Sequence, residues 1–358
     1  MRRSRTRPAA ALGLALCSLL LLAACGAQSA NAATSVSGGG PSSQLRLGYF
    51  ANLTHATALV GLRQGFFKRA LGSTRLTTDQ FNAGPAEMEA LFAGSLDAGY
   101  VGPSPAVNAF VQSHGEALRI VAGATSGGAE LVVHPSITSV SQLKGKKLGT
   151  PQLGNTQDVA LRYYLAEHGL ATTQTGGGDV SVEPTDNSTI VTAFKEGQLD
   201  GAWVPEPYAS ELVLQDGGKV LVDERTLWPK GRFATTELVV SETYLKQHPQ
   251  SVRALIEGQV RTNAWIAGNE AAAKAAVGDQ LATLAGKPLP PAVLDRAWSE
   301  IQLTNDPLAG SIVVDSQHAI KVGLAKQQNL HGLCDLSLLN QALASEQQPR
   351  VGAGTLGI

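Results

Sequence analysis

The stretch ALFAGSLDAGYVGPSP, residues 90–105, returns about a hundred residues later in altered form as AFKEGQLDGAWVPEPY, residues 193–208. Each copy begins with residues whose pattern is typical of a helix, followed by a glycine and a Leu-Asp pair. A short apolar run that ends in prolines comes next. A helix ended by glycine and followed by a buried strand is common to α/β proteins. The shared Leu-Asp pair and the aromatic-valine ending go beyond that common pattern. We therefore expect two related α/β lobes.

The rest of the chain supports this interpretation. Short apolar runs alternate with helical patterns from residue 45, and a second series of the same kind begins at residue 146, which is typical of parallel α/β units. The segment ELVV also occurs twice, at residues 130–133 and 237–240. From Ser251 onward the pattern is helical and shows no strand. We expect this helical C-terminal portion to pack on the first lobe.

The N-terminal segment has the pattern of an export signal. Arginines come first, and the apolar run 9–22 that follows is short for a membrane span. The run ends in Leu-Ala-Ala-Cys-Gly, which resembles the bacterial lipobox, and this predicts a signal peptide at residues 1–24 and lipidation of Cys25; the alternative is an ordinary cleavage site. Residues 25–43 are predicted to be a flexible tether, because they are small, polar and uncharged.

The composition excludes several classes of function. Without the four arginines of residues 1–24 the net charge falls from −1 to −5, which argues against nucleic acid as a partner. Of three cysteines, only Cys334 remains once Cys17 is removed and Cys25 is lipidated, so no intramolecular disulfide is expected.

Motifs for nucleotide, metal or covalent chemistry are missing from the sequence. There is no GxxxxGK[ST], no strand–GxGxxG–helix, no HExxH and no Cys/His cluster with metal-ligand spacing. The segment Gly102–Ala106 has prolines on both sides of its serine, which fits a nucleophile elbow poorly. We expect no cofactor, no metal and no enzymatic activity.

Four segments carry a resemblance to a known family: GYFANLTHATALVGLRQGFF (48–67), FNAGPAEMEALFAGSLDAGYVGPSPAVNAF (81–110), LKGKKLGTPQLGNTQDVALRYYL (143–165) and EGQLDGAWVPEPYA (196–209). With the lipobox, they resemble the solute-binding lipoproteins of ABC importers, in the nitrate/sulfonate/taurine-type branch. The resemblance implies a type II periplasmic-binding fold with two α/β lobes, two crossovers and a ligand cleft. Placing the crossovers at the ELVV segments gives lobe one as 44–133 plus 231–358 and lobe two as 134–230.

The resemblance implies that the protein is the binding component of an importer. The ligand would be a small organic anion, most simply an aliphatic sulfonate or taurine, bound by lobe closure and delivered to an ABC permease with its ATPase subunits. The protein would be a monomer, anchored by lipid to the outer face of the cytoplasmic membrane.

Ligands of open parallel sheets bind beyond the carboxyl ends of the strands. Polar and small residues that follow predicted strands are therefore the candidate ligand-binding residues. They are Asn52, His55, Asn82, Gly84, Ser104, Thr125, Ser126, Gln152, Asn155, Thr156, Asn187, Trp203 and Glu206.

This set is rich in neutral donors and has no arginine, which suits a sulfonate bound by helix N-terminal amides and hydroxyls. Asn155 stands where a helix N-cap belongs, although Asp158 in the same first turn would compete with an anion. His55 is a candidate donor to the anion, or else a capping residue. Glu206 is a candidate for binding the ammonium of taurine, or else a structural glutamate of the turn or hinge.

Other ligands stay open from the sequence. These are nitrate or bicarbonate, a thiamin-pyrimidine precursor and an aromatic sulfonate. An enzyme on the same fold, of the pyrimidine-synthase kind, is a remote alternative because the interior has one cysteine and no cysteine-rich motif.

Overall fold

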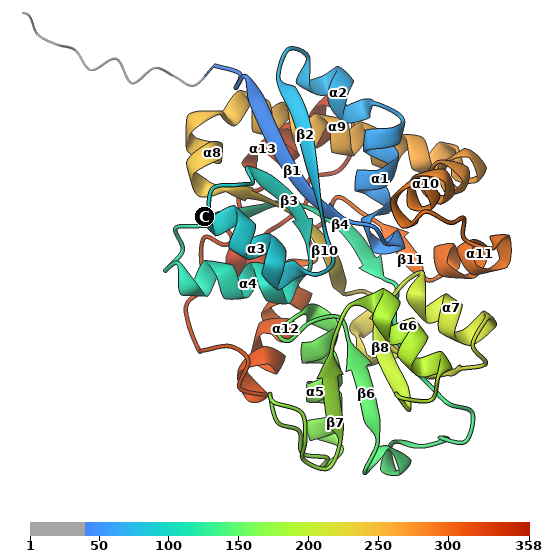
Figure 1. The fold of residues 1–358 in the computed structure, drawn as a ribbon. Helices are drawn as coiled ribbons and strands as arrows, with labels where there is room; N and C mark the ends of the chain where they lie inside the picture. Colours follow the sequence, from blue (N-terminus) through green and yellow to red (C-terminus); the bar gives the residue numbers. More distant parts are fainter. Residues whose placement is uncertain (1–39) are drawn as a thin grey trace, which may run out of the picture. The chain divides into compact units, whose positions relative to one another are not determined.

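Within residues 40–358 the strands form two separate sheets, one of six strands and one of five (Figure 1). The computed structural model describes residues 40–358. The predicted signal peptide, Cys25 and most of the predicted tether lie outside the described residues. Near the start of the described residues, the Ser42 N–H donates to Ser251 Oγ at 2.8 Å and the Ser42 carbonyl accepts from Thr74 Oγ1 at 2.7 Å.

The first sheet has the order β11-β4-β10-β3-β1-β2. Its strands are β1 (Gln44–Phe50), β2 (Arg75–Phe81), β3 (Ala98–Val101), β4 (Leu118–Gly127), β10 (Ala234–Ser241) and β11 (Ile301–Leu303). Strand β1 is parallel to β2 and β3, whereas β10 is antiparallel to both of its neighbours.

The second sheet has the order β7-β6-β8-β5-β9. Its strands are β5 (Ala129–Val133), β6 (Lys147–Thr150), β7 (Ser181–Pro184), β8 (Gly201–Pro205) and β9 (Lys219–Asp223). Strand β6 is parallel to β7 and β8, and β5 is antiparallel to β8 and β9.

The two sheets repeat one topology. The order β4-β10-β3-β1-β2 corresponds strand by strand to β9-β5-β8-β6-β7, and β3 and β8 are the strands of the repeated sequence from which two related lobes were predicted. The antiparallel strand of each sheet carries one ELVV segment and enters from the other half of the chain.

The first lobe boundary differs from the prediction. Strand β5, which a boundary at residue 133 leaves in lobe one, pairs with β8 and β9 in the second sheet. The chain therefore crosses at Gly127 and Gly128, whose φ values of 78° and 76° favour glycine. The ELVV strand is the first element of the second lobe rather than the crossover. The return crossover, residues 224–233, contains the 3-10 helices η3 (Glu224–Leu227) and η4 (Pro229–Gly231).

Helices pack on both sheets, and we call each sheet with its helices a lobe (Figure 1). Those of lobe one from the N-terminal half are η1 (Leu53–His55), α1 (Ala56–Arg63), α2 (Phe66–Leu71), α3 (Gly84–Phe92) and α4 (Pro103–Gln112). Those of lobe two are η2 (Val140–Leu143), α5 (Thr156–Glu167), α6 (Asn187–Lys195) and α7 (Tyr208–Leu214).

The C-terminal portion is mainly helical. It contains α8 (Glu242–Gln247), α9 (Pro249–Gly268), α10 (Glu270–Ala285), α11 (Pro291–Ser299), α12 (Ala309–Lys321), α13 (Ser337–Ser345) and η5 (Gly354–Leu356). Its buried side chains, such as Val252, Leu255 and Leu339, share one apolar core with strands β1, β3 and β4. The expectation that strands are absent here is wrong, because β11 pairs with the end of β4 beside the crossover.

Within residues 40–358, no helix is both long and apolar enough to cross a membrane.

Candidate ligand-binding site

A polar cavity lies between the lobes, lined by residues of both. Lobe one contributes Phe50, Asn52, Thr54, His55, Asn82, Gly102 and Thr235, and lobe two contributes Pro151, Asn155, Thr156, Gln157, Asn187 and Pro205. Its empty volume is about 310 Å³, part of it open to solvent. None of the lining residues is an Asp, Glu, Lys or Arg. The cavity thus suits a small polar ligand.

Three helices begin at this cavity. Gly102 is the N-cap of α4, Asn155 is the N-cap of α5, and Asn187 is the first residue of α6. The first N–H groups of a helix have no partner inside it, and the aligned peptide dipoles give that end roughly half a positive charge. The field at the cavity therefore favours an anion although no cationic side chain is present.

The start of α5 is built to leave this field intact. Asn155 Oδ1 accepts from the Gln157 N–H at 3.0 Å and so caps the helix. Asp158 is fully buried and turned away from the cavity, accepting from Arg162 Nε at 3.0 Å and from the Gly154 N–H at 2.9 Å. The expected competition between Asp158 and an anion does not arise, because Arg162 already balances its charge.

His55 is a neutral hydrogen-bond donor. The Phe50 N–H donates to His55 Nδ1 at 3.2 Å, so the ring proton is on Nε2. Burial lowers the pKa of His55 to about 3. The Phe50 ring lies 4.3 Å from the imidazole, centroid to centroid, and holds it in place. His55 can therefore donate to a ligand without bringing a charge.

Two buried side-chain oxygens of the cavity wall have no hydrogen-bond partner within residues 40–358. They are Thr156 Oγ1 and Asn187 Oδ1, on residues only 4% and 7% exposed. Buried polar atoms in native proteins are nearly always paired. The Thr156 hydroxyl can donate to an anionic ligand, whereas Asn187 Oδ1 can only accept and would be satisfied by an O–H or N–H of a ligand.

Six of the predicted site residues thus come together: Asn52, His55, Asn82, Asn155, Thr156 and Asn187. Seven predicted residues do not line the cavity, and they divide into residues of local structure and residues of buried networks.

The first group supports the loops around the cavity. Thr125 Oγ1 donates to the Thr54 carbonyl at 2.6 Å, Ser126 Oγ accepts from the Phe233 N–H, and the Gln152 carbonyl accepts from the Asn155 N–H. Gly84, the first residue of α3, packs against Pro105 so closely that a Cβ would collide with its ring.

The second group makes buried hydrogen bonds to carboxyl groups. Ser104 Oγ donates to Asp315 Oδ2 at 2.7 Å, and Trp203 Nε1 donates to Glu224 Oε2 at 2.8 Å. Burial raises the pKa of Asp315 to about 7 and that of Glu224 to about 8.

Glu206 joins the lobes through its side chain and its backbone. Its fully buried carboxylate accepts from Arg296 Nη1 at 2.9 Å and from the Ser210 N–H at 3.1 Å. Its carbonyl accepts from the Leu53 N–H at 2.9 Å, beside Asn52. Burial, with the adjacent Glu130, raises the pKa of Glu206 to about 7.

The cavity also has lining residues that were not predicted. Thr235 is the second residue of β10, and its Oγ1 donates to the Gly127 carbonyl at 2.7 Å. Its place where the chain returns to lobe one is the signal that could have found it. Pro205 and Gln157 adjoin predicted residues in the sequence.

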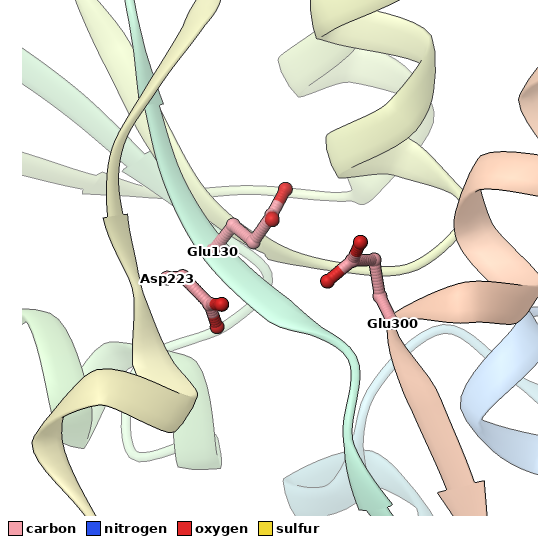
Figure 2. A group of neighbouring side chains, drawn as sticks. All are labelled: Glu130, Asp223 and Glu300. Atoms are coloured by element: carbon pink, nitrogen blue, oxygen red, sulfur yellow. The ribbon is translucent and has the colours of Figure 1, made fainter. Parts of the chain in front are cut away.

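Three carboxylates gather near the crossovers, outside this cavity. Figure 2 shows Glu130, Asp223 and Glu300, whose nearest oxygens lie within 4.8 Å of one another. Arg225 pairs with Asp223 and Glu300, and Arg296 pairs with Glu130. These ion pairs account for the cluster without a bound cation.

Comparison with known proteins places the chain in a family. A family model described as the NMT1-like family matches residues 38–278. The chain belongs to this family. The taurine-binding periplasmic protein of Escherichia coli K12 is 26% identical over 203 residues, which are 57% of this chain and 61% of that protein. The chain spans less than two thirds of the curated relatives it matches first.

Solved structures confirm the predicted periplasmic-binding fold. The alkanesulfonate-binding protein SsuA of Xanthomonas axonopodis pv. citri, bound to MOPS, has a TM-score of 0.68 at 22% identity and covers 80% of this chain and 96% of its own. The nitrate-binding protein NrtA of Synechocystis PCC 6803 has a TM-score of 0.72 at 16% identity and covers 86% of this chain and 91% of its own. The predicted resemblance to the nitrate/sulfonate/taurine-type proteins is confirmed.

Gly102→Ala is expected to block lobe closure. Gly102 has φ −71° and ψ 158°, which alanine adopts freely, but its Cβ would collide with Thr156 Oγ1 of the other lobe. The collision is avoided only if the lobes open or the Thr156 hydroxyl is displaced. Either change lowers the ligand affinity at least about tenfold, which is 1.4 kcal/mol. Calorimetry measures the affinity. Gly268→Ala, with open space around it, is the matched control. Equal affinities for the two variants would contradict the prediction.

The buried neutral His55 predicts a dependence of stability on pH. Its folded pKa of about 3 lies below the ordinary 6.5, so the unfolded chain takes up the proton first and stability falls as the pH drops below 6.5. Between pH 7 and pH 5 this amounts to roughly 2 kcal/mol, full stability being present at the higher pH. Urea unfolding of the parent protein and of His55→Gln at both pH values checks this. Between pH 7 and pH 5, the free energy of unfolding of the parent should fall by roughly 2 kcal/mol more than that of the variant. Parallel losses in both proteins would show that His55 is not the group responsible.

Proposed function

We propose that this protein is the extracytoplasmic substrate-binding component of an ABC importer, and that its ligand is a small, singly charged oxyanion of the alkanesulfonate class. The observation that carries the proposal is the convergence of three helix starts and neutral donors on one cavity between two lobes. A sulfonate has three weakly basic oxygens and a permanent charge. Helix N-terminal amides, hydroxyls and the His55 N–H match those oxygens without a strong cation.

Lobe closure supplies the binding mechanism. Both lobes line the cavity, so a ligand makes its full set of contacts only when they meet, and its differential affinity shifts the protein toward that state. Gly102 of lobe one and Thr156 of lobe two lie close together across the cavity, since a Cβ on Gly102 would collide with Thr156 Oγ1. A permease with its ATPase subunits would receive the ligand from the closed form. We propose that the protein acts as a monomer attached to the membrane by a lipid on Cys25.

The cavity favours a plain alkanesulfonate over taurine. An ammonium taken out of water needs a negative partner, and no acidic side chain lines the cavity. Glu206, the candidate from the sequence, is paired with Arg296 instead. The Asn187 side-chain oxygen can accept one hydrogen bond from an ammonium but cannot balance its charge. The helix ends that attract the sulfonate also repel the ammonium.

Nitrate is the second candidate, because of size. The cavity is small, with an empty volume of about 310 Å³ that includes space open to solvent, and nitrate requires less room than a sulfonate with its alkyl group. Aromatic sulfonates and pyrimidines fit less well. Phe50 is the one Phe, Tyr or Trp lining the cavity, and its ring already packs against His55 at a tilt of 34°.

A thermal-shift screen of the purified protein against ethanesulfonate, longer alkanesulfonates, taurine, nitrate, bicarbonate and pyrimidines tests the proposal. A ligand present at one hundred times its Kd stabilises the folded form by about 2.7 kcal/mol, which is a visible shift. We expect shifts with alkanesulfonates that Gly102→Ala reduces by about half or more, because a tenfold weaker ligand at the same concentration stabilises the folded form by only about 1.4 kcal/mol. A shift with nitrate and none with any sulfonate would establish the second candidate, and a shift with pyrimidines alone would reject both.

Taurine and 2-hydroxyethanesulfonate differ in one terminal group, so they measure the cost of the ammonium directly. We expect calorimetry to give the hydroxy compound an affinity at least about tenfold higher, or 1.4 kcal/mol. Asn187→Asp places a carboxylate on the cavity wall and should narrow or reverse this ratio, whereas Asn187→Ser should not. Taurine binding as tightly as the hydroxy compound in the parent protein would rule out the assigned preference.

A further inference from the structure

Two arginines connect the lobes through reciprocal ion pairs. Arg296 of α11, in lobe one, donates through Nη1 to Glu206 and Ser210 at 2.9 and 2.8 Å, and through Nη2 to Glu130 at 2.7 Å. Arg225 of η3, in the return crossover, pairs with Glu300 of lobe one and donates to Asp223 at 2.8 Å. Arg296 thus binds two carboxylates of lobe two, whereas Arg225 binds Asp223 of lobe two and Glu300 of lobe one.

The carboxylates need these arginines. Glu130, Asp223 and Glu300 come from β5, the end of β9 and the residue before β11, and they face one another in Figure 2. Like charges within 4.8 Å repel. Glu130 is 3% exposed and Glu206 is fully buried, so solvent screens little of this charge. The observed approach of these elements holds only while both cations stand between them.

The network surrounds the crossovers, where lobe motion must occur. A Cβ on Gly127 would lie 2.8 Å from the Glu300 carbonyl and 3.5 Å from Arg225 Cδ. Gly128 follows, and its carbonyl accepts from the Glu206 N–H at 2.9 Å. Rotation at these two glycines would change the distance between Arg296 and Glu206 and between Arg225 and Glu300.

We propose that Arg296 and Arg225, with Glu130, Glu206, Asp223 and Glu300, form a hinge clamp that sets the balance between open and closed lobes and thereby the affinity for the ligand. This rests on the proposed function, since only a protein that binds by closure has an affinity governed by that balance. The six residues are positioning residues, and none of them lines the cavity.

The clamp also reaches the ligand loop. The Glu206 carbonyl accepts from the Leu53 N–H, and Leu53 stands between Asn52 and His55. Fixing Glu206 with Arg296 therefore fixes the loop that carries three cavity residues, Asn52, Thr54 and His55. If the binding-competent fraction falls, the apparent Kd of every ligand rises by the same factor. A cavity substitution instead changes different ligands by different factors.

The test uses full-length protein and the variants Arg225→Gln and Glu300→Gln, whose side chains are partly exposed and whose loss leaves the cores intact. Arg253→Gln is the matched control, because Arg253 pairs with Glu257 inside α9. One spin label on each lobe reports the interlobe distance by double electron–electron resonance without ligand. Calorimetry gives Kd for ethanesulfonate and for 2-hydroxyethanesulfonate.

We expect both clamp variants to lengthen the ligand-free interlobe distance and to weaken both probes by the same factor, at least fivefold, with the control unchanged. The double variant should lose less affinity than the two single variants lose together, because Arg225 and Glu300 form one ion pair. Unchanged distances, or a loss for one probe only, would overturn the proposal. If neither probe binds the parent protein, the proposed function fails, while the ligand-free distances still support or refute the clamp.

Arg296 requires a variant that keeps the fold. Arg296→Gln alone leaves two buried carboxylates unpaired, which costs several kcal/mol. The triple variant Arg296→Met, Glu130→Gln, Glu206→Gln removes all three charges together. It should unfold near the parent temperature and still show the longer distance, whereas a parent-like distance would count against the clamp.

Discussion

The strand that each sheet receives from the other half of the chain constrains the rest of the structure, because it brings both crossovers to one place. Strand β10 lies antiparallel between β3 and β4, and β5 lies antiparallel between β8 and β9. The parallel strands beside them therefore end toward the other lobe, and the helices that follow begin there. The cavity, the helix starts and the ion pairs of the hinge clamp are all consequences of this exchange.

Electrostatics in the cavity and at the hinge follow opposite designs. The cavity has no charged side chain, so its positive field comes from backbone groups that do not move and do not titrate. The charges Asp158 and Arg162 stand close by but cancel one another within the buried start of α5. At the hinge, charged side chains meet across the lobes, where their attraction depends on the distance between the lobes. The groups that recognise the ligand are thereby different from the groups that control the movement of the lobes.

The sequence predicted the residues whose position depends on local pattern. Asn155, Thr156 and Asn187 stand at helix starts after short strands, and that arrangement is enough to bring them to the cavity. The same local pattern could not place Trp203 or Glu206. Their hydrogen-bond partners, Glu224 and Arg296, are brought to them by the packing of elements distant in the sequence. The crossover was predicted five residues late for a related reason. A strand pattern predicts that β5 forms, and pairing with β8 and β9 decides which sheet it joins.

The repeated segment shows how one topology came to hold two different corners. After β3 the chain has Gly102, and the absence of a side chain there lets Thr156 of the other lobe approach. After β8 the corresponding corner has Glu206, whose side chain reaches Arg296 and whose backbone holds Leu53. The corner at Gly102 allows the lobes to close, and the corner at Glu206 stabilises the closed state. A carboxylate at the first corner would block the approach, and a glycine at the second would leave Arg296 with Glu130 as its one carboxylate partner among the described residues. The asymmetry of the two copies is therefore required by the motion between the lobes rather than by the ligand.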